Sequence, residues 1–404
     1  MNNASENKGA VVDMAGTGKK RILWLDGLKG LACFFMFLAH WGEAVYPRVH
    51  FGSDAPLHTK KVEDFLHAFP LDGWVFVAVF CICSGMMLSL KVMKAQKSAD
   101  KLRSTGTQIV KRYLRLMLPM VPVAIVVWIL GNTGAFWNVK AAEITGSKWL
   151  SKYYTEAPSI VGIVESVLVK TWFYGDDTIS TAFWMMYQIF YGSMMSILMG
   201  MVYWVYKRKA FIIYGITFIV MLPRHDYVAG FALGAILALG LAEGIVDEMV
   251  ARLKSRAGFL PGILGIVFFV VGIILGAYPG DSEPMWPYTL LPAAFIEAYY
   301  SIGGFLVILG VWMSGGLQRI FTGKVMLFMG KISYELFLVH IPIMFSLGMW
   351  LWMLLFSAGM SYHAASLVTF TVICAVVIVV SWGYSRTFTK WCAAAAERIE
   401  ARLG

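Results

Sequence analysis

The chain has 404 residues, of which 59% are hydrophobic and only 14% are charged. Soluble globular proteins carry about 25% charged residues, and the mean hydropathy of this chain is +0.68. This composition excludes a water-soluble protein and predicts an all-α fold, a polytopic membrane helix bundle. Positive charge in cytoplasmic loops explains the net charge of +10, so we predict no nucleic-acid binding. The five cysteines lack ligand spacing, and we expect neither a disulfide framework nor a metal site.

The chain begins with a polar segment, residues 1–20, which is typical of a disordered cytoplasmic tail. Apolar segments near spanning length follow at 28–46, 73–90, 116–130, 183–206, 211–222, 228–241, 260–278, 295–313, 332–356 and 365–382. A membrane-spanning helix needs roughly 20 apolar residues. We therefore predict about ten transmembrane helices in a domain of residues 21–390, followed by a second cytoplasmic tail at 391–404.

The distribution of basic residues predicts the sidedness of this multi-pass protein. With the amino terminus inside and ten crossings, 26 of the 34 Lys and Arg residues fall in predicted inner segments and 8 in outer ones. Inner segments of membrane proteins are enriched in Lys and Arg. We therefore expect both termini to be cytoplasmic.

One predicted outer segment, residues 131–181, is much longer than the other connections and rich in aromatic residues such as Trp149 and Tyr153. Aromatic side chains in such a segment either stack against sugar rings or form a belt at the membrane interface. The sequence leaves both interpretations open.

Titratable side chains are rare within the predicted spans, and each costs on the order of 2.5–3.5 kcal/mol to insert. In the first span Lys29 and His40 share one helix face about 16.5 Å apart, and Asp26 lies close to that face. Glu43 follows His40 by three residues. Its carboxylate can hold one ring nitrogen, which makes the other nitrogen a better base. Alternatively, His40 only bonds a neighbouring helix and Glu43 lies at the outer surface.

A second histidine, His340, follows Lys331 in a later span. Its distance from that lysine is about 13.5 Å along the helix, which places it near the depth of His40. The two imidazoles are thus expected to face one buried site, although His340 alone is also typical of an interhelical hydrogen-bond donor. Pro342 predicts a local kink or a cavity-lining element.

Two arginines, Arg112 and Arg115, lie on one helix face at the start of the third span. Their planar guanidinium groups suit bidentate phosphate binding. The alternative is that this inner charge only sets topology and contacts anionic lipid.

Taken in order, these motifs resemble the integral-membrane acyltransferase 3 family. The resemblance rests on residues 25–30 (LDGLKG) with His40, residues 80–85 (FCICSG), residues 112–115 (RYLR) with Pro119, and residues 330–334 (GKISY) with His340 and Pro342. The chain departs from the family pattern where Ile189, beside Gln188, replaces a glutamate after Trp184. The family's acidic residue near the end of the last span is also missing.

The resemblance implies transfer of an acyl group, expected to be acetyl, from cytosolic acyl-CoA to an extracytoplasmic glycan or small hydroxylated acceptor. His40 would be the catalytic imidazole, as a general base or as an acyl carrier. The geometry adds Glu43 and His340 to the catalytic set. On the donor side Lys29, Arg112 and Arg115 would contact the coenzyme A phosphates, with Asp26 beside Lys29.

Two other functions account for the same residues. A proton-coupled secondary transporter would use His40, Glu43 and His340 as a proton relay. A non-catalytic sensor or scaffold would tolerate the loss of both histidines.

Overall fold

The computed structural model describes residues 11–13, 20–48, 73–95, 109–224, 227–280, 284 and 286–403. Their regular structure is helical except for one hairpin, in which β1 (Val11–Asp13) pairs antiparallel with β2 (Lys20–Ile22). This hairpin includes part of the tail predicted to be disordered, and the rest of residues 1–20 lies outside the described residues. At the other terminus α21 (Phe388–Leu403) forms most of the predicted second tail.

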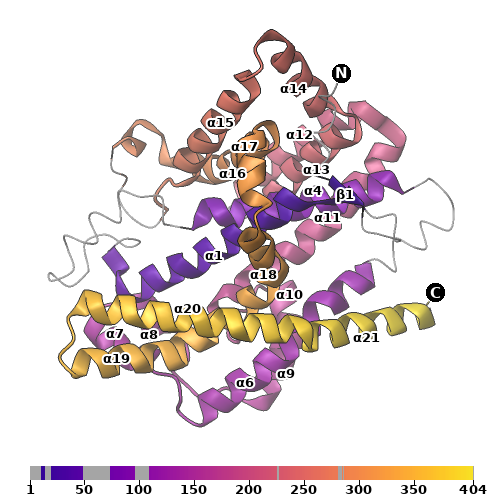
Figure 1. Ribbon diagram of the computed structural model, residues 1–404. Helices are drawn as coiled ribbons and strands as arrows, with labels where there is room; N and C mark the ends of the chain where they lie inside the picture. Colours follow the sequence, from indigo (N-terminus) through magenta and orange to yellow (C-terminus); the bar gives the residue numbers. More distant parts are fainter. Residues whose placement is uncertain are drawn as a thin grey trace.

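Long apolar helices form the body of the protein (Figure 1), and the predicted all-α membrane bundle is confirmed. They are α1 (Leu23–Val45), α4 (Trp74–Lys94), helical residues 109–117 with α6 (Met120–Asn132), α11 (Trp184–Tyr206), α12 (Ala210–Met221), α13 (Val228–Ala242), α15 (Leu260–Gly276), α16 (Ile296–Met313), α18 (Lys324–Ile343) with α19 (Met349–Ser357), and α20 (Tyr362–Arg386). Shorter helices α14 (Ile245–Arg256) and α17 (Gly315–Phe321) connect them. The buried core lies among α1, α4, α11, α13 and α18.

All ten predicted apolar segments are helical, but fewer helical runs are individually long enough for a crossing. In the described part of the chain, seven helical runs are long and apolar enough to cross a membrane, or eight if the bent pair α13 and α14 forms one span. The difference arises because α12 has 12 residues and α15 has 17, whereas a straight crossing takes roughly 20. In addition, α11 and α12 form one continuous helical run.

Helices α1 and α18 touch backbone to backbone at a pair of glycines. A Cβ atom on Gly30 would overlap the backbone nitrogen of Gly330, and a Cβ on Gly330 would overlap the carbonyl oxygen of Asp26. Small residues permit this close approach of helices in membranes. The glycines of the two sequence motifs therefore fix where these helices cross.

Beyond the crossing the two helices run parallel. The Cys33 thiol donates to the Ser333 carbonyl oxygen at 3.0 Å, and farther along the Phe37 ring lies 5.8 Å from the ring of His340. His40 and His340 each follow a crossing glycine by ten residues, which is about 15 Å of helix. Both imidazoles therefore lie at the same distance from the crossing point along the two parallel helices.

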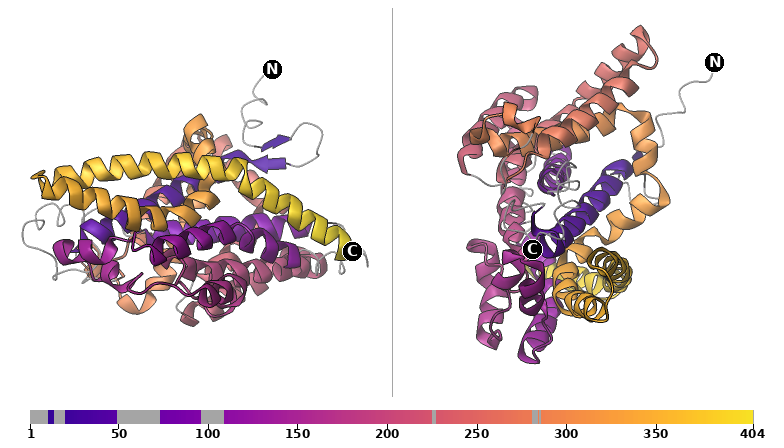
Figure 2. Two further views of the ribbon diagram at one scale, coloured as in Figure 1. Left: turned by 90° about the horizontal axis from the view of Figure 1, so that it is seen from below. Right: turned by 90° about the vertical axis from the view of Figure 1, so that its left-hand side faces the viewer.

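Residues 131–181 fold into short helices α7 (Asn138–Thr145), α8 (Lys148–Lys152), α9 (Ile160–Glu165) and α10 (Thr171–Phe173). Figures 1 and 2 show α7 and α8 toward one end of the bundle, and β1 and the end of α21 toward the other. The Ser147 hydroxyl caps α8 by accepting from the Leu150 amide at 3.3 Å, and it donates to the Glu43 carbonyl oxygen at 2.7 Å. This contact attaches α8 to the end of α1.

The predicted disturbance at Pro342 is present as a π-helical segment, η8 (Met344–Gly348), directly after α18. Proline lacks the N–H that the α-helical ladder requires, and π turns absorb such interruptions. Within η8 the Phe345 ring lies 4.9 Å from the Trp149 ring, and the Phe345 carbonyl oxygen accepts from the Trp137 amide at 2.9 Å. The end of α18 therefore also supports residues 131–181, which we call the excursion.

Candidate active site

A cavity of about 220 Å³ lies beside His40, bounded by α1, α4, α8, α11 and α18. Its lining from α1 includes Cys33, Met36, His40 and Glu43. Their spacing of three or four residues places them on one helix face. Sequence reasoning identified only the two polar members, although the same periodicity also marks Cys33 and Met36.

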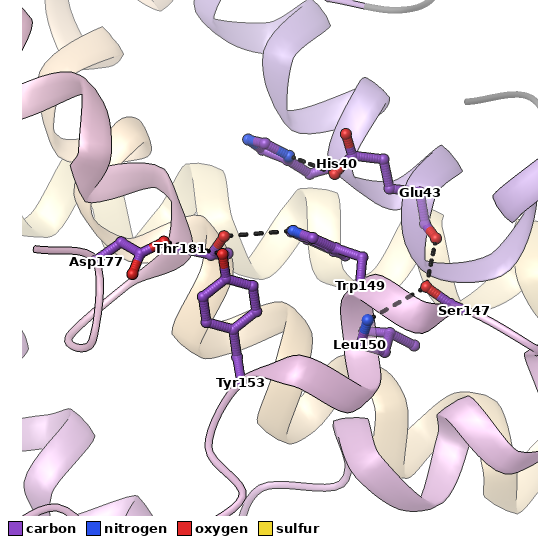
Figure 3. A network of polar contacts seen from close by, with 8 residues as sticks. All are labelled: His40, Glu43, Ser147, Trp149, Leu150, Tyr153, Asp177 and Thr181. Carbon is purple, nitrogen blue, oxygen red and sulfur yellow. Dashed lines mark hydrogen bonds and ion pairs between the residues drawn. The ribbon is translucent and has the colours of Figure 1, made fainter. Parts of the chain in front are cut away.

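The imidazole of His40 is held by the neighbouring carboxylate, as the spacing predicted. Its Nδ1 lies 3.1 Å from Oε2 of Glu43 (Figure 3), and the two side chains are 21% and 11% exposed. A carboxylate only accepts hydrogen bonds, so Nδ1 carries the proton and donates it. The lone pair at Nε2 of His40 is therefore left for a ligand.

Two further rings stack on His40. The Trp149 indole, which faces the His40 ring in Figure 3, has its ring centroid 5.4 Å away at an interplanar angle of 7°. The His340 ring lies 5.4 Å away at 17°. These rings come from α8, α1 and α18, which are far apart in the sequence. Their stacking fixes the plane in which the His40 imidazole can meet a ligand.

The second imidazole, His340, also uses its Nδ1 within the protein. Its Nδ1 donates to the Leu336 carbonyl oxygen at 3.0 Å, because a carbonyl oxygen only accepts. Its Nε2 has no hydrogen-bond partner among the described residues, although the residue lines the cavity and is only 2% exposed. The structure thus brings His340 to the site that the sequence predicted and leaves one nitrogen unpaired.

The excursion supplies the opposite wall of the cavity. The Tyr153 hydroxyl donates to Oδ2 of Asp177 at 2.9 Å, and Nε1 of Trp149 donates to the Thr181 hydroxyl at 3.3 Å. Burial raises the pKa of Tyr153 to about 12, so its phenol is neutral and remains a donor near pH 7. Burial also raises the pKa of Asp177.

Trp149 and Tyr153 of the excursion lie at the candidate site, and sugar stacking and an interface belt both stay predictions for this segment. Both line the cavity, and Trp149 packs on an imidazole. Sequence reasoning did not include Trp149, Tyr153 or Thr181 among the site residues. The density of aromatic residues was the available signal, but no local spacing rule connects them to His40.

The predicted phosphate-binding residues lie outside this cavity lining. Nζ of Lys29 pairs with Asp26 at 3.2 Å, and Lys29 precedes the lining residue Cys33 by about one helical turn. Nε of Arg112 donates to the Ser193 hydroxyl at 3.1 Å.

The two arginines contact different helices. Arg112 is directed to α11 through Ser193, whereas Arg115 pairs with Glu397 of α21 at 3.2 Å. The Tyr334 hydroxyl donates to the Leu116 carbonyl oxygen at 2.6 Å, which attaches the arginine-bearing helix to α18. Arg112 and Arg115, which their spacing predicted to lie on one helix face, thus bond to two different helices.

The residues at the departure from the family pattern do not contribute to the cavity lining. Oε1 of Gln188 accepts from the Tyr227 amide at 2.7 Å, at the start of α13. Ile189 is buried in the core. Gln188 therefore supports a helix end and does not replace the missing carboxylate.

Comparison with known proteins gives one finding. The family model described as an acyltransferase domain matches residues 22–386. No curated protein and no solved structure has a significant match to the chain.

Proposed function

Since the chain belongs to the acyltransferase 3 family, as its match over residues 22–386 establishes, we propose that it acylates a hydroxyl of an extracytoplasmic acceptor with a group from cytosolic acyl-CoA. Family membership makes this multi-pass membrane protein an acyltransferase, so the transporter and sensor alternatives are set aside. The acyl group that we expect is acetyl. The acceptor that we expect is a carbohydrate or a small hydroxylated molecule.

One observation carries the proposal: His40 lines a cavity with Nε2 available while Glu43 holds Nδ1. In the proposed step Nε2 removes the proton of the acceptor hydroxyl, whose oxygen bonds to the thioester carbonyl carbon. The carbon–sulfur bond then breaks, and the leaving sulfur takes the proton back from Nε2. The carboxylate of Glu43 stabilises the imidazolium that forms between the two transfers.

Transfer through an acyl group on His40 uses the same nitrogen. In that path Nε2 bonds to the carbonyl carbon and the thiolate leaves. The acceptor oxygen then bonds to the same carbon, the bond to Nε2 breaks, and the thiolate takes the hydroxyl proton. Acid quenching and mass spectrometry of the peptide that contains His40 distinguish the two paths.

We assign the donor phosphates to Lys29, Arg112 and Arg115, with Asp26 orienting Lys29 at 3.2 Å. The separation of Lys29 and His40, about 16.5 Å along α1, suits the long arm between the phosphates and the thioester of coenzyme A. The ion pair of Arg115 and Glu397 is 44% and 61% exposed. Because exposed pairs contribute little stability, an incoming phosphate can replace Glu397.

The experiment compares wild type with His40→Gln by mass spectrometry of cell-surface glycans and small metabolites. We expect His40→Gln to lower acylation by about 10²- to 10⁴-fold, the usual contribution of a general base. Glutamine keeps a similar size and hydrogen bonds, so protein level and membrane insertion should stay normal.

His363→Gln is the matched control, because His363 is exposed on α20, lies outside the cavity lining, and bonds the Tyr46 hydroxyl through Nδ1 at 3.1 Å. This variant should acylate normally. Full activity of His40→Gln would remove His40 from the mechanism.

A further inference from the structure

We propose that Nε2 of His340 binds the acyl acceptor, by accepting a hydrogen bond from a second hydroxyl beside the one that reacts at His40. This inference rests on the proposed function and adds a requirement on the substrate. The acceptor must carry two neighbouring hydroxyl groups. His340 would then be a substrate-binding residue that selects diols over simple alcohols.

The first support is the unpaired nitrogen. His340 is 2% exposed, its Nδ1 proton is committed to the Leu336 carbonyl oxygen, and its Nε2 has no partner among the described residues. Buried polar groups are nearly always hydrogen-bonded. His340 lines the cavity, and we infer that a ligand bound there completes the missing bond.

The second support is the direction of the missing hydrogen bond at Nε2, where His340 must be the acceptor. With its only proton on Nδ1, neutral His340 is solely an acceptor at Nε2. It can therefore neither donate to a thioester oxygen nor stabilise the oxyanion that develops there. The group that it recognises must be an O–H or N–H donor.

The third support is the relation between the two imidazoles. Their rings stack at 5.4 Å with an angle of 17°, and both residues line one cavity. Nε2 of His40 is likewise an acceptor, because Glu43 holds its Nδ1. Two hydroxyls on adjacent carbons supply two donors a short distance apart, which matches two acceptor nitrogens on neighbouring rings.

Amide N–H groups in the acyl-CoA arm are another source of donors. The cavity favours the acceptor, since its polar lining of Glu43, Tyr153 and Thr181 gathers around His40 at the excursion end. Toward the end of the cavity nearer Lys29, where we expect acyl-CoA, the lining includes the apolar residues Met36 and Phe337. We therefore assign the second donor to the acyl acceptor.

The test uses full-length purified protein, acetyl-CoA as donor, and two truncated acceptors, ethane-1,2-diol and ethanol. Wild type should acetylate the diol at least about tenfold more efficiently per hydroxyl, as kcat/KM, because hydrogen-bonding sites reject analogues that lack the bonded group. His340→Phe should reduce this ratio to about one, because kcat/KM for the diol falls further than kcat/KM for ethanol. His340→Gln should keep part of the preference, since its Oε1 also accepts.

His363→Phe serves as the control, because His363 lies outside the cavity lining. Its diol preference should equal that of wild type, and the thermal midpoint of His340→Phe should confirm folding. If folded His340→Phe keeps the wild-type ratio of diol to ethanol kcat/KM, the inference is overturned. It is also overturned if the wild-type protein shows no preference for the diol or acetylates neither alcohol. An unchanged ratio with a raised KM for acetyl-CoA reassigns His340 to the acyl donor. The mass spectrometry of glycans and metabolites distinguishes failure of this inference from failure of the proposed function. If the proposed function is wrong, acylation does not depend on His40.

Discussion

Both imidazoles of the cavity donate their Nδ1 proton to a group within the protein. Nε2 of each ring is therefore a hydrogen-bond acceptor for a ligand. His40 bonds Glu43 at 3.1 Å and His340 bonds the Leu336 carbonyl oxygen at 3.0 Å. The first bond was predictable because i and i+3 side chains meet on a helix. The second was not, because whether a side chain bonds its own helix backbone depends on its rotamer and on the packing around it.

Trp149 positions His40 through ring stacking, and we predict that its truncation impairs catalysis. Trp149→Ala should lower kcat by about 10- to 100-fold, because a freed imidazole loses the alignment needed for proton transfer. Trp149→Phe should keep most activity, since a smaller ring still stacks. Initial rates of acetyl transfer measure both effects.

The control for this series is Trp382→Ala, a tryptophan on α20 that is 44% exposed. It should leave the rate unchanged. Equal rates for Trp149→Ala and wild type would show that the stacking has no part in positioning His40.

Among the elements, the crossing of α1 and α18 sets the height of both histidines. We predict that Gly330→Ala forces the two backbones apart, since its Cβ would overlap the Asp26 carbonyl oxygen. The expected cost is about 1–3 kcal/mol of stability, as for other overpacked sites, with a larger loss of acyl transfer. Thermal unfolding in detergent and transfer rates report the two effects.

A methyl group is tolerated where a helical glycine faces open space. At Gly383 of α20 a Cβ would meet nothing within 4 Å, so Gly383→Ala should behave like wild type. If Gly330→Ala also retained full stability and activity, the close crossing would not be what aligns the imidazoles.

The short helix α8 depends on one buried asparagine. Nδ2 of Asn138 donates to the carbonyl oxygens of Leu150 and Tyr153 at 2.7 and 2.6 Å. Asn138→Ala should cost about 1–3 kcal/mol because it leaves buried acceptors unpaired, and it should lower activity by releasing Trp149. Thermal midpoints and transfer rates measure these losses.

Asn132 provides a matched comparison, because its Nδ2 also donates to two carbonyl oxygens, of Trp128 and Pro158, but at an exposed position. Water replaces those bonds, so Asn132→Ala should cost less than Asn138→Ala. Equal costs would argue against a special role for the α8 anchor.

At the scale of the whole molecule, the arrangement predicts access from two sides. The excursion end carries His40, Glu43 and the short helices, whereas Lys29 and the arginines lie toward the other end of their helices. If both termini are cytoplasmic, as the basic residues predict, donor and acceptor enter from opposite faces of the membrane.

Cysteine labelling tests this sidedness. Ser151→Cys, exposed on α8, should react with a membrane-impermeant maleimide in intact cells, whereas Ser255→Cys, exposed on α14, should react only after permeabilisation. The unmodified chain is the control, because four of its five cysteines are buried and Cys374 is partly buried. The reverse labelling pattern would invert the predicted orientation.

The sequence by itself determined the membrane class, the positions of the helices and the placement of His40, Glu43 and His340 at one site, because apolar run length, helical periodicity and the cost of buried charge are local properties. Hydropathy alone did not show which of the ten segments is long enough to cross by itself, because that depends on where each helix ends, as at α12.

Only the tertiary structure decided which residues surround the imidazoles. Trp149 comes to His40 because Ser147 and Asn138 attach α8 to its neighbours, and the histidines meet because two glycines let α1 and α18 touch. Some of these contacts join residues 300 positions apart, as between Cys33 and Ser333. Their partners are selected by shape and hydrogen bonding after the helices pack, which no local pattern encodes.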